Sequence, residues 1–460
     1  MPRITKIISD ALKICIILIT IALIYVILSS NTENRVRESP YETVKNRKPP
    51  KEDRNGNQIA IDDTYRISYS LYGYTFRQYG ISFKSWASVT TGLVHSFSPN
   101  LEKEASKRFL DPAGGNVYYA NSPAITWHKN QLVLVSRIWL NREVYEMNKQ
   151  WPANSFSDNV LFTQKFNNRL EPISNGSILG VQTPKNGWIG DGPIEPRIFK
   201  FKETLYVSFN TAAFFAKDEL VDFTFLFDYE KSLPIIPRIH GDTPMKSVTP
   251  KGEVPRDKHW MPFTKKGQLY FVHCLDPLRV MKCRVPSGFC EFIFKQDKKN
   301  SFAFHRHTSP LRGGTPLEVY EYPYYVGVVH STLYKKQNHK RFYSSHVLVF
   351  DVEKYRIVYI SHRIQVNKQV MDRVKMVRPY MEDSFIFPVS LVLESKNSWI
   401  IGAHINDHDS ILLRMKGMSS LIDLAIKLDK RVSPKGRPNQ GFFHQHIKET
   451  VRNETNIEFE

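Results

Sequence analysis

Residues 122–138 read SPAITWHKNQLVLVSRI. A short apolar strand, a polar turn with Lys and Asn, and a second strand rich in β-branched residues form the pattern of a β-hairpin. The same pattern returns four times further along the chain. The later copies are residues 195–210 (EPRIFKFKETLYVSFN), 260–276 (WMPFTKKGQLYFVHCLD), 313–331 (GGTPLEVYEYPYYVGVVHS) and 387–407 (FPVSLVLESKNSWIIGAHIND).

Successive copies begin between 53 and 74 residues apart. A single hairpin is barely stable in water, whereas repeated four-stranded blades around an axis protect their edges. Five copies therefore predict an all-β fold, a five-bladed β-propeller over residues 59–418. The alternative is an irregular β-sandwich in which hairpins recur by chance. Within the C-terminal segment 419–460, residues 419–430 (SSLIDLAIKLDK) predict a helix that packs outside the blades.

The N-terminus indicates the compartment. Residues 14–32 are nineteen uncharged residues, and an apolar helix of about 20 residues spans a bilayer. We interpret 1–13 as a cytoplasmic tail, 14–32 as a transmembrane signal anchor and 33–58 as a polar stem. A cleaved signal peptide is the alternative, but no A-x-A-like site follows Leu28. Although basic residues flank the span on both sides, we expect a single-pass type II protein of the Golgi or another secretory compartment.

Three of the four cysteines, Cys274, Cys283 and Cys290, lie close together in sequence. In an oxidising lumen we expect two of them to form a disulfide and the third to stay outside it. Zinc binding is the alternative interpretation, but the spacings are not C-x-x-C. The sequons at 175–177 and 453–455 would permit N-glycosylation in such a compartment.

The chain is strongly basic, with Lys+Arg 64, Asp+Glu 45 and a formal charge of +19. Such a balance first suggests nucleic acid or an anionic surface. Residues 251–345 alone hold 17 Lys and Arg against 7 Asp and Glu. A lumenal domain would not meet nucleic acid, so we expect no nucleic-acid partner. The charge instead predicts a smaller anion, such as a nucleotide diphosphate.

Polar residues gather where the hairpins begin and end. In a propeller the entry loops of the inner strands converge on a concave axial site, where ligands bind. An acid, an arginine and a histidine at the entrances of several blades therefore indicate a binding site. The candidates are Asp191, Glu195, Arg197, Lys258, His259, Trp260, Arg312, Gly313, Gly314, His330, Asp383 and Asp407.

Five motifs carry a resemblance to a known family. They are Glu-Pro-Arg-Ile-Phe at 195–199, Lys-His-Trp-Met-Pro-Phe at 258–263, Arg-Gly-Gly-Thr-Pro at 312–316, Gly-x-x-His-Ser at 327–331 and Glu-Asp-Ser at 382–384. Over roughly residues 190–410 the chain resembles the five-bladed propellers of β-mannoside phosphorylases and of eukaryotic, fungal-type β-1,2-mannosyltransferases. The resemblance implies mannose as the transferred sugar.

The resemblance also implies one catalytic carboxylate, in an E-D-P-R motif, acting in an inverting reaction. The chain departs from that motif, because Ile194 stands for its acid and Glu195 for its catalytic aspartate. The carboxylate is therefore kept but lengthened by one methylene. His259 likewise stands where the family's K-N-W motif has asparagine, which favours a donor other than inorganic phosphate.

Each candidate residue has a functional and a structural interpretation. Glu195 would be the general acid or base, or would pair with Arg197 at a blade rim. Arg312 would bind phosphate through its planar fork, and Lys258 and His330 would add charge and hydrogen bonds near the donor. Trp260 would stack on a sugar or pack in the core.

The remaining candidates concern backbone approach, the acceptor and a metal. Gly313 and Gly314 would let the backbone approach a ligand, or would form a tight turn. Asp383 would orient an acceptor hydroxyl or support Arg312. Asp407 and Asp409 form a D-x-D pattern that can bind a divalent cation, but we expect no metal and no other cofactor.

Together these features predict a membrane-anchored glycosyltransferase. It would transfer mannose, β-linked and with inversion, from a nucleotide sugar such as GDP-mannose to a glycan acceptor. The alternatives are a β-mannoside phosphorylase or hydrolase, and a lumenal glycan-binding propeller without catalysis.

Overall fold

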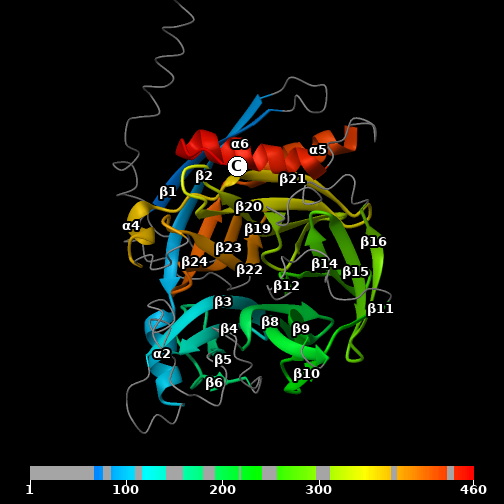
Figure 1. Cartoon of the computed structure of the whole chain (residues 1–460). Helices are drawn as coiled ribbons and strands as arrows, with labels where there is room; N and C mark the ends of the chain where they lie inside the picture. The colour runs from blue at the N-terminus through cyan, green and yellow to red at the C-terminus, as the bar shows by residue number, and fades with distance from the viewer. Residues whose placement is uncertain are drawn as a thin grey trace, which may run out of the picture. The chain divides into compact units, whose positions relative to one another are not determined.

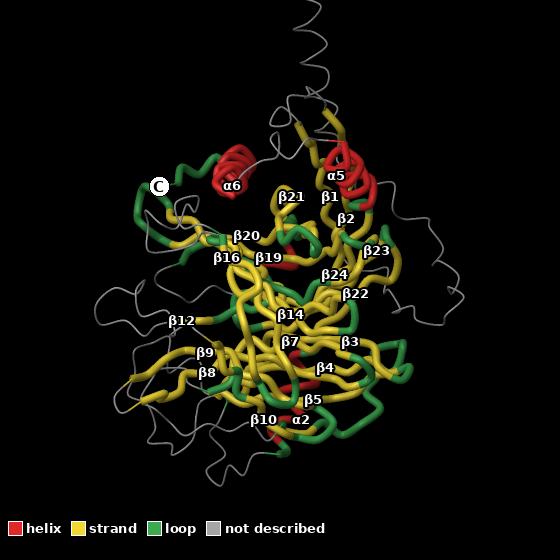
Figure 2. Tube along the Cα trace, turned by 90° about the vertical axis from the view of Figure 1, so that its right-hand side faces the viewer, coloured by secondary structure: helices red, strands yellow, loops and turns green. Residues whose placement is uncertain are grey.

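The computed structural model describes residues 67–75, 84–108, 117–140, 159–179, 192–216, 219–240, 256–296, 311–374, 381–431 and 440–459. All of them belong to the unit Glu52–Glu460. Their strands form five sheets, which we number as blades one to five in chain order (Figures 1 and 2).

Each of the first three blades starts with a predicted hairpin. Blade one contains β3 (Tyr118–His128), β4 (Gln131–Leu140), β5 (Asn159–Phe166) and β6 (Ser177–Ile178). Blade two contains β7 (Ile194–Phe201), β8 (Thr204–Ala216), β9 (Glu219–Asp228), β10 (Leu233–Ile235) and β12 (Arg256–Asp257). Blade three contains β13 (Met261–Lys265), β14 (Gln268–Leu275), β15 (Leu278–Arg284), β16 (Phe289–Lys295) and, at its edge, β11 (Arg238–His240).

The last two blades complete the ring. Blade four contains β17 (Leu311–Arg312), β18 (Glu318–Glu321), β19 (Tyr324–Tyr334), β20 (Arg341–Asp351) and β21 (Arg356–Arg363). Blade five contains β22 (Ile386–Ser395), β23 (Ser398–Ile405) and β24 (Asp409–Lys416), joined by β2 (Lys84–Ser96) and β1 (Ile67–Thr75). The predicted five-bladed propeller is therefore confirmed, and each blade contains one of the five hairpins: β3–β4, β7–β8, β13–β14, β18–β19 and β22–β23.

Blade five closes the ring with strands from both ends of the described chain. β2 pairs antiparallel with β24, with Leu93 opposite Leu413, and β1 then pairs with β2. A parallel pair also links two adjacent blades. The chain runs from β10 of blade two into β11, which pairs with β16 of blade three. These pairings leave fewer free strand edges, which protects a β protein from edge-to-edge association.

Apolar side chains fill every interface between neighbouring blades. Five buried clusters join blade one to two, two to three, three to four, four to five and five back to one. Many strands are buried on both faces of their sheet. Such strands read as continuous apolar runs, as in residues 132–135 (LVLV). The core is thus divided among the interfaces and leaves polar groups at the strand entries.

Four helices accompany the blades in the part of the chain that the structure describes: α2 (Ser98–Ser106), α4 (Lys368–Met371), α5 (Ser419–Arg431) and α6 (Gln440–Thr455). α5 confirms the predicted helix and packs on β2 and β21, outside the blades as expected. α6 was not predicted and also packs on β21, burying Phe443, Ile447 and Val451 (Figure 1).

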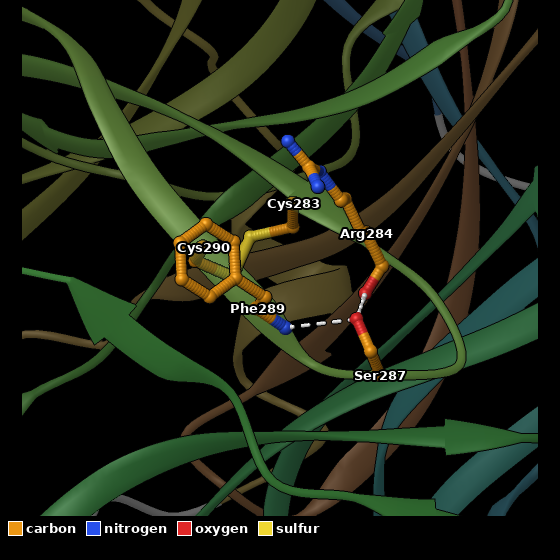
Figure 3. The surroundings of a disulfide bond; sticks show 5 residues. All are labelled: Cys283, Arg284, Ser287, Phe289 and Cys290. Atoms are coloured by element: carbon orange, nitrogen blue, oxygen red, sulfur yellow. Dashed lines mark hydrogen bonds between the residues drawn. A yellow bond between two sulfur atoms is a disulfide. The ribbon is translucent and has the colours of Figure 1, made fainter.

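The predicted disulfide joins Cys283 and Cys290 across β15 and β16, with Cα atoms 4.1 Å apart (Figure 3). In the hairpin turn the Ser287 hydroxyl donates to the Arg284 carbonyl and accepts the Phe289 N–H. Cys274 takes no part in the bond. Nor do the described residues contain a group of three or more potential metal ligands, so the zinc interpretation has no site in this part of the chain.

Within the described ranges, no helix has the length and apolar character needed to cross a bilayer. The predicted tail, anchor and stem, residues 1–58, lie outside those ranges.

Candidate active site

Glu195 lies at a bulge where β7 begins. The register of β7 against β8 shifts between Ile194 and Arg197, and Glu195 has a φ of 50°. A non-glycine residue held in this left-handed region costs about 1–3 kcal/mol and marks functional sites more often than ordinary strands. The first strand of blade one has the same device, with a bulge after Asn121 and a φ of 57° at Ser122. Such bulges re-aim side chains.

The Glu195 carboxylate contacts two basic groups of the next blade. Its Oε1 lies 3.3 Å from Lys258 Nζ and its Oε2 lies 3.0 Å from His259 Nδ1. The side chain is 14% exposed, so one part of it still reaches solvent. Burial alone would raise the pKa of the carboxyl, but the short contact with His259 Nδ1 and the Lys258 and Arg197 cations outweigh burial and hold that pKa well below its usual range. Glu195 is therefore ionised at neutral pH.

Arg197 is buried and acts through backbone carbonyls. Its Nε donates to the Gly314 carbonyl, and its Nη1 donates to the Glu195 carbonyl at 2.9 Å. Burial lowers the pKa of Arg197 to about 10, which leaves the guanidinium charged at neutral pH. The sequence left open a pair between the Glu195 carboxylate and Arg197. In the structure Arg197 instead contacts the Glu195 backbone carbonyl, and the carboxylate contacts Lys258 and His259.

Two buried histidines lie side by side next to Glu195. The rings of His259 and His330 are 4.9 Å apart, and both also contact the ring of Phe387. Burial lowers the pKa of His259 to about 3 and that of His330 well below its usual range. Both rings are therefore neutral at pH 7. Desolvation by burial thus removes the positive charge that the sequence led us to expect from His330. His330 Nδ1 is buried with no hydrogen-bond partner among the described residues.

Asp407 joins this set from blade five. The backbone N–H of Asp407 donates to His404 Nδ1 at 3.0 Å, which places the histidine proton on Nε2, 3.3 Å from Asp407 Oδ1. The His404 ring stacks on Phe387 at 5.2 Å. Asn121 of blade one donates to the Asp407 carbonyl at 2.9 Å. Phe387 and His404 were not predicted; the H-x-x-D spacing at the end of a strand was the available signal.

The glycine pair permits two close backbone contacts, one between blades four and three and one inside blade four. A Cβ on Gly313 would lie 1.9 Å from the His259 carbonyl oxygen, and one on Gly314 would lie 1.9 Å from that of Val328. Neither glycine has a positive φ, so the tight-turn interpretation does not apply. The close approach that these glycines permit in the structure is between protein backbones. Arg312, directly before them, pairs with His330 across β17 and β19.

The remaining candidates lie elsewhere. Trp260 is buried in the core against Phe223 and Phe271. Asp383 contacts Lys335 at 2.5 Å rather than Arg312. Asp409 contacts Arg373 at 3.3 Å and accepts a hydrogen bond from Ser96, so Asp407 and Asp409 have different partners and do not converge on a cation. Asp191 lies outside the described residues.

The structure therefore brings residues from four blades together. Arg197 and Lys258 lie next to the Glu195 carboxylate, and Arg312 lies next to the neutral His330. Asp407 contacts His404, whose ring stacks on Phe387. The positive charge exceeds the negative charge, which favours an anionic ligand.

The fold and this site define a five-bladed β-propeller with a basic axial cluster around one ionised carboxylate. No protein-family model matches the chain. A segment of 69 residues is 39% identical to "Beta-mannosyltransferase 2" of Komagataella phaffii, covering 14% of this chain and 10% of that protein. A segment of 70 residues is 31% identical to "Beta-mannosyltransferase 1" of the same species, covering 13% and 10%. These matches confirm the resemblance that the motifs indicated, over a tenth of the relatives' length.

Solved structures with a similar fold have low sequence identity. A β-1,2-mannobiose phosphorylase from Listeria innocua is 10% identical with a TM-score of 0.43, covering 78% of this chain and 99% of that chain. A GDP-Man-dependent mannosyltransferase from Leishmania mexicana is 10% identical with a TM-score of 0.37, covering 70% and 94%.

Proposed function

We propose that the chain is an inverting mannosyltransferase that uses Glu195 as its general base. The observation that carries this proposal is the ionised Glu195 carboxylate, held at the axis between Lys258 and His259. The sequence matches to two β-mannosyltransferases support mannose as the sugar.

The charge state of Glu195 favours transfer over its alternatives. In transfer from a nucleotide sugar, the diphosphate leaves as an anion and the acceptor hydroxyl must lose a proton, so the protein must supply a base. In hydrolysis or phosphorolysis, the leaving sugar oxygen must gain a proton from an acid. A carboxyl whose pKa is far below its usual range is a poor acid at neutral pH. Its ionised form fits the base.

The bond changes follow from this assignment. The acceptor oxygen attacks the anomeric carbon of the donor and gives its proton to Glu195. The bond from that carbon to the phosphate oxygen breaks, and the electron pair leaves with the diphosphate. Lys258 and Arg312 would offset the charge of the diphosphate. Because Lys258 would then share its charge with the donor, donor binding would also make Glu195 a stronger base.

The donor, the acceptor and the compartment belong to the same proposal. We propose GDP-mannose as the donor, because the resemblance implies mannose as the sugar, and a glycan hydroxyl as the acceptor. We further propose that residues 14–32 anchor the chain in a secretory membrane as a type II protein. Their nineteen uncharged residues support this, and so does the Cys283–Cys290 disulfide, since disulfides persist in oxidising compartments.

A donor screen on the purified full-length protein in detergent tests the reaction class. We expect mannosylated product from a mannoside acceptor with GDP-mannose and little from other nucleotide sugars. Phosphate-dependent turnover of β-mannosides without transfer from any nucleotide sugar would establish the phosphorylase instead. Binding of mannosides without turnover of either kind, by protein whose circular dichroism shows a folded β structure, would establish the glycan-binding propeller.

A further inference from the structure

The two sequons of the chain lie in opposite structural settings. The first, Asn175-Gly176-Ser177, lies in the loop that leads into β6, the outermost strand of blade one. The second, Asn453-Glu454-Thr455, forms the last residues of helix α6. Since a sequon is defined by the asparagine and by the hydroxyl residue two positions on, one enzyme has to reach both side chains at once.

The first sequon presents both side chains to solvent. Asn175 and Ser177 are exposed, and Asn175 forms no hydrogen bond with the described residues. Ser177 opens a strand, and in extended chain residues two apart point to the same side. The glycine between them has a packing reason, because a Cβ on Gly176 would lie 2.2 Å from Phe162 Cζ. Packing therefore requires glycine at the middle position, Gly176, and leaves the side chains of Asn175 and Ser177 accessible to solvent.

The preceding residue fixes the loop without using Asn175. The Ser174 carbonyl accepts a hydrogen bond from Gln164 Nε2 at 2.9 Å, and the Ser174 hydroxyl accepts the Lys165 N–H at 3.0 Å. The loop is thus anchored to β5 immediately before the asparagine. Because β6 is the outermost strand of its blade, a bulky group on Asn175 would lie at the rim, away from the axial site.

The second sequon is held in a helix by its own contacts. Residues two apart on a helix do not face each other. The Thr455 hydroxyl donates to the Val451 carbonyl at 2.6 Å, and Glu454 contacts both His362 and Arg363 at 2.9 Å. Reading this sequon would require the end of α6 to unwind from β21.

We infer that Asn175 is an N-glycosylation site and that Asn453 is not. The amide nitrogen of Asn175 bonds to the anomeric carbon of an oligosaccharide carried on a lipid pyrophosphate. The bond to the pyrophosphate breaks with its electron pair, and the amide loses one proton. The inference requires entry of the chain into the secretory pathway and is independent of the transferase reaction.

The test is expression of the full chain in a eukaryotic cell, followed by an amidase that removes Asn-linked glycans. We expect one amidase-sensitive step in gel mobility. That step should be lost in N175Q and in S177A and kept in N453Q and in T455A. Peptide mass spectrometry should find asparagine converted to aspartate at residue 175 after the amidase. S177A removes the sequon without touching the asparagine, so a folding defect of N175Q would not obscure the result.

Three outcomes would overturn the inference: no amidase-sensitive step in the wild-type chain, a step lost only in N453Q and T455A, or two separate steps. Transferase activity is a separate readout, because Asn175 takes no part in the axial site. N175Q and S177A should therefore retain wild-type turnover, and a chain that is glycosylated at Asn175 but inactive would contradict only the proposed reaction.

Discussion

Glu195 combines a left-handed backbone conformation with contacts to two basic groups, Lys258 at 3.3 Å and His259 at 3.0 Å. The bulge at the start of β7 directs the carboxylate toward Lys258 and His259, and Arg197 donates a hydrogen bond to the Glu195 backbone carbonyl. Strain at such a position persists only when the surroundings fix it. At the residue scale, the site is therefore an ionised carboxylate fixed by charge and by backbone geometry together.

Replacing Lys258 with methionine tests how this charge is maintained. Lys258 lowers the pKa of Glu195, so its removal should raise that pKa. A general base works only when deprotonated, and we therefore expect the acidic limb of the pH dependence of kcat/KM to move to higher pH. Lys129→Met, at an exposed lysine of blade one, is the matched control. An acidic limb that stays in place in K258M would show that Lys258 does not set the charge state of Glu195.

Sequence reasoning identified much of this site from motif residues at the strand entries. Glu195 and His259 are two of the three positions, with Ile194, at which the chain departs from the motifs of the family it resembles. The structure shows Glu195 and His259 in contact at 3.0 Å. That contact could not be predicted, because it joins two blades and depends on a bulge whose register no local pattern encodes. For the same reason the sequence could not show that Asp383 contacts Lys335 and not Arg312, the support of which was one of its two expected roles.

At the scale of elements, α5 is held to blade four by a buried charge cluster. Asp429 of α5 is 1% exposed, forms a hydrogen bond with Arg356 and accepts one from the Tyr324 hydroxyl at 3.0 Å. Asp351 also contacts Arg356, at 3.3 Å. The helix closes over β21 through these groups as well as through its apolar face.

Asp429→Ala should therefore lower the free energy of unfolding by about 1–3 kcal/mol, because it leaves the Tyr324 hydroxyl without its partner and Arg356 with Asp351 alone. Denaturant unfolding of the purified chain measures the change. Lys427→Ala, at an exposed position of the same helix, should change stability by less than about 0.5 kcal/mol. Equal effects of the two substitutions would show that the cluster contributes nothing beyond ordinary surface contacts.

The elements divide into those that sequence predicts and those that it does not. The five hairpins and α5 carry their signal within some twenty residues, as an alternation or a helical period, and all of them were found. The pairing of β2 with β24 joins segments on opposite sides of the described chain and leaves no local trace. α6 was missed because residues 440–455 (QGFFHQHIKETVRNET) are mostly polar and become a helix by packing on β21.

At the scale of the whole molecule, buried titratable groups give the stability a pH dependence. His259, His330 and His346 are buried and His446 is half-buried, and burial lowers the pKa of each below the ordinary value of 6.5. Burial lowers the pKa of the half-buried His95 in the same direction. Below pH 6.5 the unfolded chain binds protons that these folded histidines do not, so their effect is a loss of stability as pH falls. Burial raises the pKa of Glu102 and Glu318 to about 7, and these two groups act in the opposite direction.

Because the histidines outnumber the two glutamates, stability should fall between pH 6.5 and 5. Each proton contributes a slope of about 1.4 kcal/mol per pH unit. Urea unfolding across that window measures the slope. It should become shallower in His446→Gln and steeper in Glu102→Gln, since each variant removes one group of opposite sign. A slope that changes the same way in both variants would contradict these assignments.

The central claim, that Glu195 is the base of a mannosyl transfer, is tested most directly by Glu195→Gln. Turnover of GDP-mannose with a mannoside acceptor should fall by about 10²–10⁴-fold, while donor binding persists. The control is Glu203→Gln, at the exposed turn between β7 and β8, which should keep wild-type turnover. Transfer by E195Q at the wild-type rate would contradict the claim.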